Sequence, residues 1–399
     1  MVGIGQVHCL KSEDNTIGGL QKAWDDALAQ ATIHDTIHQP GTGLTALGGM
    51  AFDPLKKKTA LWEKFADQAL TIPAFVFTKT GDQCYLTCNL KLKKADNSRQ
   101  LAAKIKEKEH QLFSNAPSFS LHDGILSKKE IAPEQWKRTV EKATQAIKND
   151  TAQKIVLARE MRLEFSGNAD VGVILQRLLK TQPNSYVFAI EHGNDCFMGA
   201  TPERLVKLAH GKLLSTCLAG TAPRGIDKDA DDRIGSQLLN DPKNRQEHDF
   251  VVQMIKKAVT PYAKNIVVPK KPELYKLRNL QHLYTPVTAD LLEKSGIFPI
   301  VEKLHPTPAL GGTPREASLA FIRENELLDR GWYGAPVGWL DGQNNGEFAV
   351  AIRSGLIQGK EASLFAGCGV VADSNPEDEY AETNIKFMPM LSVLEGETK

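Results

Sequence analysis

The sequence has neither an excess of one charge nor a long apolar run. Lys and Arg total 49 and Asp and Glu total 48 in 399 residues, which gives a formal net charge of +1. A chain so balanced has no global field with which to hold nucleic acid or an anionic membrane, so we expect neither as a partner. No apolar run approaches the ~20 residues that cross a bilayer, and the first residues lack the regions of a signal peptide. We therefore expect a cytoplasmic protein, in which a local anion site is still allowed.

Cysteine is sparse and unpatterned. The six cysteines are scattered along the chain, and no two have CxxC spacing. Cys84 and Cys88 lie in a strand-like stretch, where positions four apart share a face but are separated by roughly 13 Å. That separation is too long for a disulfide and awkward for one metal ion. We interpret all six as free thiols of a reducing compartment.

Several motifs of nucleotide-binding and hydrolytic enzymes are missing. The sequence contains no GxxxxGK[ST], no HExxH and no GxSxG, and no GxGxxG in a strand-turn-helix unit. These absences argue against nucleotide binding and against the common zinc and serine hydrolases. The glycines of GGTP at 311–314 precede a helical segment, where backbone N–H groups can meet an anion.

The order of predicted elements indicates one α+β fold. Residues 1–115 alternate short strands with helices, and they include a hairpin that turns at Gly81-Asp82. A helix is predicted to open with Pro133 in its first turn. After about residue 150 the strands follow one another as meanders and hairpins, which favours large antiparallel sheets with helices outside over a doubly wound parallel sheet. We predict an N-terminal region over 1–115 and a catalytic region over 130–396 of the same fold.

Glutamates near two predicted helix starts form a candidate metal site. In the last helix, Glu379, Glu382 and Lys386 are spaced so that they share one face. A second helix is predicted to carry Glu247 in its first turn. Such glutamates have an ordinary alternative role, since they offset the helix dipole. Carboxylates from two helices are also the hard oxygen ligands that Mg²⁺ prefers.

Cationic side chains on predicted strands form the complementary set. Lys154 begins the strand KIVLARE, and Arg353 lies in AVAIRSG. The ordinary alternative is that each is an edge residue whose charged head reaches solvent. Glu203 lies in GATPERLV, a predicted turn between two strands, where a solvated turn residue is the alternative.

Ten motifs occur in a fixed order between about residues 135 and 395. They are KIVLAR, GATPERL, LAGTAPRG, NRQEHDFVV, LQHLYTPV, LHPTPALGGTPREAS, GWYGAPVGW, EFAVAIRS, LFAGCGVV and PEDEYAETNIK. This series resembles the chorismate-utilising enzymes, which include isochorismate synthase, salicylate synthase and the large components of anthranilate and aminodeoxychorismate synthases. The resemblance implies a single complex α+β domain with an Mg²⁺-dependent, chorismate-binding site between its sheets and helices.

Two positions indicate the branch of the family. Relatives that use a covalent lysine carry it where this chain has Ala219. Anthranilate synthases typically carry Gln where this chain has Lys154, and they need an ammonia-supplying partner. The resemblance therefore implies the water-adding branch, an isochorismate or salicylate synthase that acts on chorismate without an obligate amidotransferase subunit.

The pathway has several readings. The stretch VGIGQVHCL is similar to menaquinone-pathway isochorismate synthases, and we expect it to begin part-way into their N-terminal region. A siderophore pathway, salicylate formation and, more remotely, a non-catalytic partner-binding relative are the alternatives. Because no coiled-coil heptads occur, we expect a monomer.

The resemblance also implies roles for individual residues. Lys154 is the general base on the attacking water, and Glu203 is the general acid, so we expect a raised pKa for Glu203. Asn244 stands where some relatives have an acidic residue. Mg²⁺ is expected on Glu247 and Glu382, with Glu379 close by. The expected substrate-binding residues are Thr221, His282, Thr307, Tyr333, Arg353, Gly367, Gly369 and Lys386, of which His282 has a satisfied core histidine as its alternative.

Overall fold

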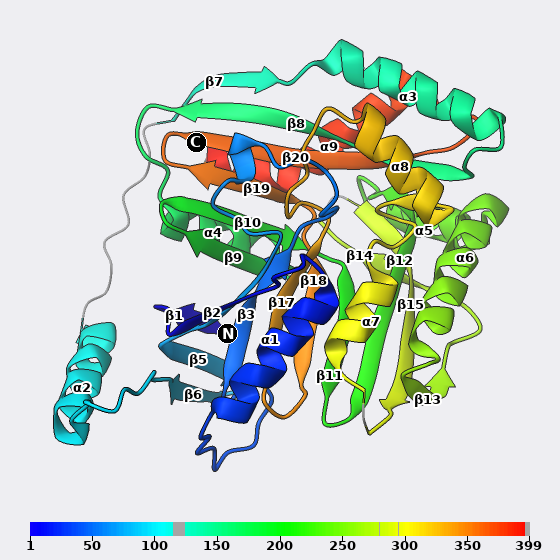
Figure 1. The fold of residues 1–399 in the computed structure, drawn as a ribbon. Helices are drawn as coiled ribbons and strands as arrows, with labels where there is room; N and C mark the ends of the chain where they lie inside the picture. Colours follow the sequence, from blue (N-terminus) through cyan, green and yellow to red (C-terminus); the bar gives the residue numbers. More distant parts are fainter. Residues whose placement is uncertain (115–123, 279, 294, 396–399) are drawn as a thin grey trace.

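Antiparallel sheets organise the chain in the computed structural model, which describes residues 1–114, 124–278, 280–293 and 295–395. Within these residues the strands form sheets of ten, seven and three strands. Every strand pairing described is antiparallel, and helices lie on the outside (Figure 1). The predicted α+β class with large antiparallel sheets is confirmed.

The ten-stranded sheet joins the two ends of the chain. Its order is β13-β15-β12-β11-β18-β17-β3-β4-β2, and β14 pairs with β15. Because β17 pairs with β3, strands from the first 72 residues extend the sheet built by residues 204–350. The bounds are β2 His8–Lys11, β3 Thr45–Met50, β4 Gln68–Ile72, β11 Arg204–Ala209, β12 Lys212–Pro223, β13 Ala263–Val267, β14 Glu273–Lys276, β15 Leu280–Leu291, β17 Pro336–Asp341 and β18 Gly346–Val350.

The seven-stranded sheet is centred on the long pair β8 and β20. Its order is β16-β8-β20-β19-β10-β9, and β7 pairs with β8. A third sheet, β1-β5-β6, contains the predicted hairpin, which turns at Gly81 and Asp82 as expected. The bounds are β1 Val2–Ile4, β5 Phe75–Thr80, β6 Gln83–Cys88, β7 Ile125–Glu130, β8 Lys154–Phe165, β9 Tyr186–His192, β10 Asp195–Thr201, β16 Gly312–Thr313, β19 Ser354–Gln358 and β20 Glu361–Val370.

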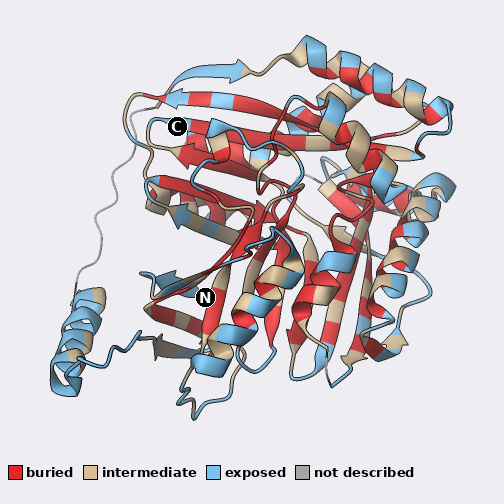
Figure 2. Ribbon diagram, in the orientation of Figure 1, coloured by how far each residue is buried: buried red, intermediate tan, exposed pale blue. Residues whose placement is uncertain are grey.

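The helices cover the outer faces of the sheets. Helix α6 packs on β12, α7 on β11, and α9 on β20. Figure 2 shows strands that are mostly buried beneath helices whose outward faces are exposed. The bounds are α1 Ile17–Gln30, α2 Ser98–Ser114, α3 Pro133–Lys148, α4 Val171–Thr181, α5 Lys228–Asn240, α6 Pro242–Val259, α7 Ile297–Leu304, α8 Arg315–Asn325 and α9 Pro376–Glu395. Among the described helices, none is long and apolar enough to cross a membrane.

One helix start differs from the sequence prediction. Helix α6 begins at Pro242, because Asp241 caps it by accepting a hydrogen bond from the Asn244 amide. Glu247 therefore lies in the second turn of the helix, and the prediction of the first turn was wrong. Pro133 does open α3 in its first turn, as expected.

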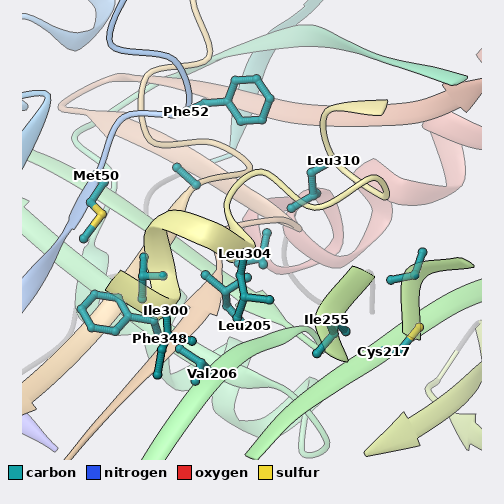
Figure 3. Close-up of a cluster of buried hydrophobic side chains, with 14 of the residues drawn as sticks. Met50, Phe52, Leu205, Val206, Cys217, Ile255, Ile300, Leu304, Leu310 and Phe348 are labelled. Atoms are coloured by element: carbon teal, nitrogen blue, oxygen red, sulfur yellow. The ribbon is translucent and has the colours of Figure 1, made fainter. Parts of the chain in front are cut away.

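The largest core cluster lies between the ten-stranded sheet and the helices that cover it. Ile300 and Leu304 of α7 point toward Leu205 and Val206 of β11 and toward Phe348 of β18 (Figure 3). Fully burying such a side chain contributes about 1.5–3 kcal/mol. The cluster also includes residues of β8 and β20, so one packed core fixes the two large sheets relative to each other.

Candidate active site

A cavity of about 440 Å³ lies where the two large sheets approach each other. Its walls come from β8 and β20 of one sheet, from β12 and β15 of the other, and from α6 and α9. The fold therefore brings together side chains that are far apart in the sequence. The predicted site residues that line the cavity are Lys154, Glu203, Thr221, Glu247, His282, Tyr333, Arg353, Gly367, Gly369, Glu379, Glu382 and Lys386.

Thr307 is the predicted site residue that does not line the cavity. It lies in the turn before Ala309 and Leu310, which do line it. The Thr307 hydroxyl is buried without a hydrogen-bond partner. Leaving a buried hydroxyl unpaired costs on the order of 1–3 kcal/mol, and nothing in the structure offsets that cost at this position.

Lys154 and Glu247 meet across the cavity wall. The Nζ atom of Lys154, at the start of β8, lies 2.5 Å from Oε1 of Glu247 on α6. Gly369 on the neighbouring strand β20 leaves the room that the lysine chain occupies, since a Cβ atom there would lie 2.4 Å from Lys154 Cε. The position of the Lys154 amino group therefore depends on the absence of a side chain at Gly369 in the next strand.

Glu203 supplies a carboxyl group that titrates near neutral pH. It follows β10 in the turn to β11, where its carbonyl oxygen accepts a hydrogen bond from the Val350 amide. Its half-buried side chain faces the cavity, and desolvation raises the pKa of Glu203 to about 7, against the opposing fields of Arg353, Lys154 and Lys386. The expected raised pKa is confirmed, and burial is its cause.

Arg353 presents a cation without a partner. It connects β18 to β19 with φ of 53°, a left-handed conformation that is uncommon outside glycine. Its guanidinium makes no hydrogen bond or ion pair with any residue that the structure describes. Burial lowers the pKa of Arg353, but a guanidinium stays charged at neutral pH. An unpaired, half-buried guanidinium in a cavity is suited to a carboxylate ligand.

Lys386 adds a second cation beside Arg353 in the same cavity. Its Nζ atom lies 2.5 Å from Oε1 of Glu382 on α9 and donates a hydrogen bond of 2.9 Å to the Gly367 carbonyl oxygen. Gly367 has no room for a side chain, because a Cβ atom would lie 2.9 Å from the Leu157 carbonyl oxygen. The lysine is thereby attached to β20 as well as to its own helix.

Neutral polar groups complete the lining. His282 Nδ1 lies 3.0 Å from Thr221 Oγ1, and its Nε2 is buried without a described hydrogen-bond partner. Burial and the nearby Arg353 and Lys386 lower the pKa of His282 to about 3, so the ring is neutral. Burial raises the pKa of Tyr333 to about 12, so its phenol keeps its proton. These groups can form hydrogen bonds to a ligand without adding charge.

The carboxylates of the cavity have the chemistry of an Mg²⁺ site. Glu247 from α6 and Glu382 from α9 line one cavity with side chains that are 40% and 48% exposed. In the described part of the chain, no three His, Cys, Asp or Glu side chains are grouped closely enough to hold a metal ion by themselves. Mg²⁺ commonly takes one or two protein carboxylates and keeps water or substrate oxygens in its other positions. Glu247 and Glu382 are donors of the type that Mg²⁺ takes, and each lies 2.5 Å from the Nζ atom of a lysine.

Arg330 is a cavity residue that the sequence reasoning missed. Its Nε and Nη2 atoms donate to the Glu326 carboxylate at 2.6 and 2.7 Å, and Nη2 also donates to the Val156 carbonyl oxygen. It thus ties the loop before β17 to β8. The only signal in the sequence is that Arg330 directly precedes the GWYGAPVGW motif. Lys243, Asn244 and Ser374 are further lining residues without an expected direct ligand role.

These features form an interior site that is suited to an anion. Two antiparallel sheets enclose a titrating carboxyl group, a lysine and an unpaired guanidinium. A family model described as "Chorismate binding enzyme" matches residues 1–395, and the chain belongs to this family. The resemblance seen in the ten motifs is confirmed.

Named relatives agree with this assignment. The chain is 43% identical over 367 residues to the isochorismate synthase MenF of Bacillus subtilis (strain 168), covering 92% of this chain and 78% of that protein. It is 37% identical over 354 residues to the salicylate biosynthesis isochorismate synthase of Pseudomonas aeruginosa, covering 87% of this chain and 73% of that protein. The solved structure of MenF, the menaquinone-specific isochorismate synthase from Escherichia coli, superposes with a TM-score of 0.83 at 26% identity, covering 98% of this chain and 85% of that one.

Proposed function

We propose that the protein is an isochorismate synthase, an isomerase that converts chorismate to isochorismate, and that it serves menaquinone biosynthesis. The observation that carries the proposal is that Lys154, at the start of β8, and Glu203, in the turn between β10 and β11, face one cavity, while Ala219 of β12 forms part of its wall. Ala219 excludes a covalent lysine nucleophile, and Lys154, in place of the glutamine typical of ammonia-using relatives, favours water as the nucleophile. The two named isochorismate synthases with the highest stated identities support the same reaction.

The reaction needs one base and one acid. Water adds at C2 of chorismate, the ring double bonds shift, and the C4 hydroxyl leaves as water. Lys154 takes a proton from the attacking water, and Glu203 gives a proton to the leaving hydroxyl. The atoms balance, because one water enters and one leaves, and a proton returned from Lys154 to Glu203 restores both groups. General acid–base catalysis typically supplies about 10²–10⁴-fold per group.

Chorismate is a dianion, and the cavity offers cations for it. The unpaired guanidinium of Arg353 matches a carboxylate through two parallel hydrogen bonds, and Lys386 adds a point charge nearby. We assign the pyruvyl carboxylate to this pair. Tyr333 and His282 provide neutral hydrogen-bonding groups. Gly367 and Gly369 belong to the proposed substrate-binding wall, where the absence of a Cβ atom leaves room for the Tyr333 hydroxyl and the Lys154 side chain respectively.

Mg²⁺ is the cofactor in this proposal. Glu247 and Glu382 would hold it, with Glu379 beside them. Bound there, the ion supplies charge neutralisation for the ring carboxylate. Glu379 is oriented by Ser374, whose hydroxyl donates to Glu379 Oε1 at 2.6 Å.

We also propose that the enzyme acts as a single chain in the cytoplasm and needs no amidotransferase subunit. All six thiols are free in the structure, as is usual in a reducing compartment. Water, unlike ammonia, needs no second protein to produce it. The division into an N-terminal region over 1–115 and a chorismate-binding region over 130–396 remains part of the same proposal.

The experiment is a product assay with purified protein, chorismate and Mg²⁺. We expect isochorismate to be resolved by liquid chromatography and no growth of salicylate fluorescence. Salicylate as the main product would replace the proposal with a salicylate synthase. The variant Lys154→Gln keeps a hydrogen-bond donor near Glu247 but removes the base, so turnover should fall by about 10²–10⁴-fold. Retention of most turnover in that variant would contradict the role of Lys154.

A further inference from the structure

Two of the ten motifs contain residues that the proposed reaction does not use. KIVLAR begins with Lys154 but ends with Arg159, and PEDEYAETNIK contains Tyr380 and Thr383 between its cavity residues. Arg159 is 3% exposed, and it does not line the cavity. Side chains alternate along a strand, so Ala158 faces the cavity while Arg159 points to the other face of β8, toward α9.

The Arg159 guanidinium is fastened to α9 by several contacts. Its Nε donates to Thr383 Oγ1 at 2.7 Å, and its Nη2 donates to the Asn384 side chain and, at 3.5 Å, to the Tyr380 carbonyl oxygen. The group also lies 4.0 Å from the centre of the Tyr380 ring and 4.9 Å from that of Phe387. Planar stacking combined with a fork of donors is a geometry that lysine does not reproduce.

A carboxylate balances the buried charge. Nη1 of Arg159 donates to Oε2 of Glu130, at the end of β7, at 2.9 Å. The Tyr380 hydroxyl donates to the same oxygen. Arg159, Glu130 and Tyr380 therefore form a closed network that joins β7, β8 and α9. Removing Glu130 would leave the buried Arg159 charge without its ion-pair partner, which is costly.

This network holds the half of α9 that carries the cavity residues. Apolar packing fixes the other half, where Phe387, Met390, Leu391, Val393 and Leu394 are buried. In the first half, Thr383 is the buried residue that the structure describes, and it bonds to Arg159. Glu379, Glu382 and Lys386 lie on the cavity face of the same segment. Tyr380 also packs against the main core and against Trp136 of α3, so the segment is held to β8 by the Arg159 network together with this aromatic contact.

We infer that Arg159 is a positioning residue, which holds the first half of α9 at the distance from β8 that lets Glu382 and Lys386 meet the ligand. The effect on substrate affinity rests on the proposed function, whereas the attachment of α9 does not. The proposed base and acid, Lys154 and Glu203, lie outside α9, at the start of β8 and in the turn after β10. Loss of the attachment should therefore weaken ligand binding more than it slows the chemical step.

The test compares Arg159→Lys with the wild-type chain in two measurements. Hydrogen exchange of the intact, ligand-free protein should rise about tenfold in peptides covering 376–386 and stay unchanged in β12. Steady-state kinetics should show KM for chorismate raised about tenfold with kcat within about threefold. Thr383→Val removes the hydroxyl that accepts from Arg159 and replaces the side chain with one of nearly equal volume. Hydrogen exchange at 376–386 and KM should both rise by about threefold in this variant. It replaces Arg159→Lys as the test if the arginine variant does not fold.

Leu213→Ala is the matched control, since Leu213 is buried on β12, which is not part of the network, and its truncation opens a cavity that destabilises the chain. It should lower the melting temperature and leave KM unchanged. An equal rise in KM in this control, or unchanged exchange at 376–386 in Arg159→Lys, would overturn the inference. If the wild-type chain does not turn over chorismate, the proposed function fails, and the exchange measurement still decides whether Arg159 holds α9.

Discussion

A Cβ atom at Gly369 would lie 2.4 Å from Cε of Lys154 and 3.0 Å from its Nζ. The two residues belong to neighbouring strands, β20 and β8. Real Cβ atoms do not approach carbon so closely, so any side chain at position 369 must displace the lysine. Two features therefore fix the position of the proposed base. One is its ion pair with Glu247, and the other is the room that Gly369 leaves for the lysine side chain because glycine has no Cβ atom.

Gly369→Ala should reduce kcat by about 10²-fold or more, because a displacement of about 1 Å can cost that much in catalysis. The residue has no left-handed φ, so the backbone tolerates alanine and the fold should persist. Circular dichroism and the melting temperature check the fold, and chorismate turnover checks the activity. Gly167→Ala is the control, since a Cβ atom there meets nothing within 4 Å. Equal activity of the two variants would contradict the role of this space.

Glu203 predicts the alkaline limb of the pH profile. The acid form donates the proton, and the pKa of Glu203 is about 7 because of burial. As the pH rises above that value, kcat should fall about tenfold per unit. Glu203→Gln should lower kcat by about 10²–10⁴-fold and remove this limb from the residual activity. If the alkaline limb persisted unchanged in Glu203→Gln, the limb would have to arise from the titration of another group.

The same carboxyl group predicts how stability changes with pH. Its pKa is raised on folding from 4.5 to about 7, so between these values the folded chain binds more protons than the unfolded chain. The Glu203 contribution to the free energy of unfolding therefore decreases as the pH rises through this window and is constant above it. Denaturant titrations at pH 5 and pH 8 should show that the free energy of unfolding decreases less between these pH values in Glu203→Gln than in the wild type. Equal losses would place the raised pKa elsewhere.

Three residues show which features of the site could be predicted from the sequence and which could not. Lys154 and Glu382 were predictable because ordered motifs carry them, and the cavity contains both. The partner of Lys154 was not predictable, because no local spacing brings position 154 to position 247; the packing of α6 on β12 does so. Arg159 was inside a quoted motif, yet its role depends on alternation along β8 and on the distant α9, which only the tertiary structure reveals.

The prediction of helix starts and turns was limited because neighbouring residues compete for the same local hydrogen bonds. Glu247 was expected in the first turn of α6, but Asp241 accepts a hydrogen bond from the Asn244 amide, so the helix begins at Pro242 and Glu247 lies in its second turn. Thr307 shares a motif with residues near the cavity, but the turn it belongs to directs its hydroxyl into the protein interior. Membership of a motif therefore predicts that a residue lies near the cavity. The direction of its side chain depends on backbone geometry, which cannot be read from the sequence.

Arg353 should determine substrate affinity. Its guanidinium has no described partner, so the substrate carboxylate is its proposed partner. Arg353→Lys keeps the charge but loses the fork, and KM should rise about tenfold to 10²-fold with a smaller change in kcat. Steady-state kinetics measure the split between KM and kcat. Arg233→Lys, on the exposed face of α5, is the control and should leave both unchanged. An unchanged KM in Arg353→Lys would remove this residue from substrate binding.

Glu247 and Glu382 should determine the metal requirement. Each accepts from one lysine at 2.5 Å, so a neutral glutamine can still take part in a hydrogen bond and the local fold should survive. Loss of one of two carboxylate donors should raise the Mg²⁺ concentration for half-maximal activity by about 10-fold to 100-fold. Magnesium titrations of Glu247→Gln and Glu382→Gln measure this change, and direct titration with Mn²⁺ measures binding without turnover.

Asp249→Asn separates a bound ion from a general charge effect. Asp249 is an exposed acid on α6, two residues beyond Glu247, and it does not line the cavity. Its loss removes the same charge, so a diffuse electrostatic effect would shift the magnesium requirement in all three variants. A bound ion would shift it only in the two glutamate variants. If wild-type activity were insensitive to EDTA, the reaction would not require a metal ion. The lysines of the cavity would then have to neutralise the ring carboxylate without Mg²⁺.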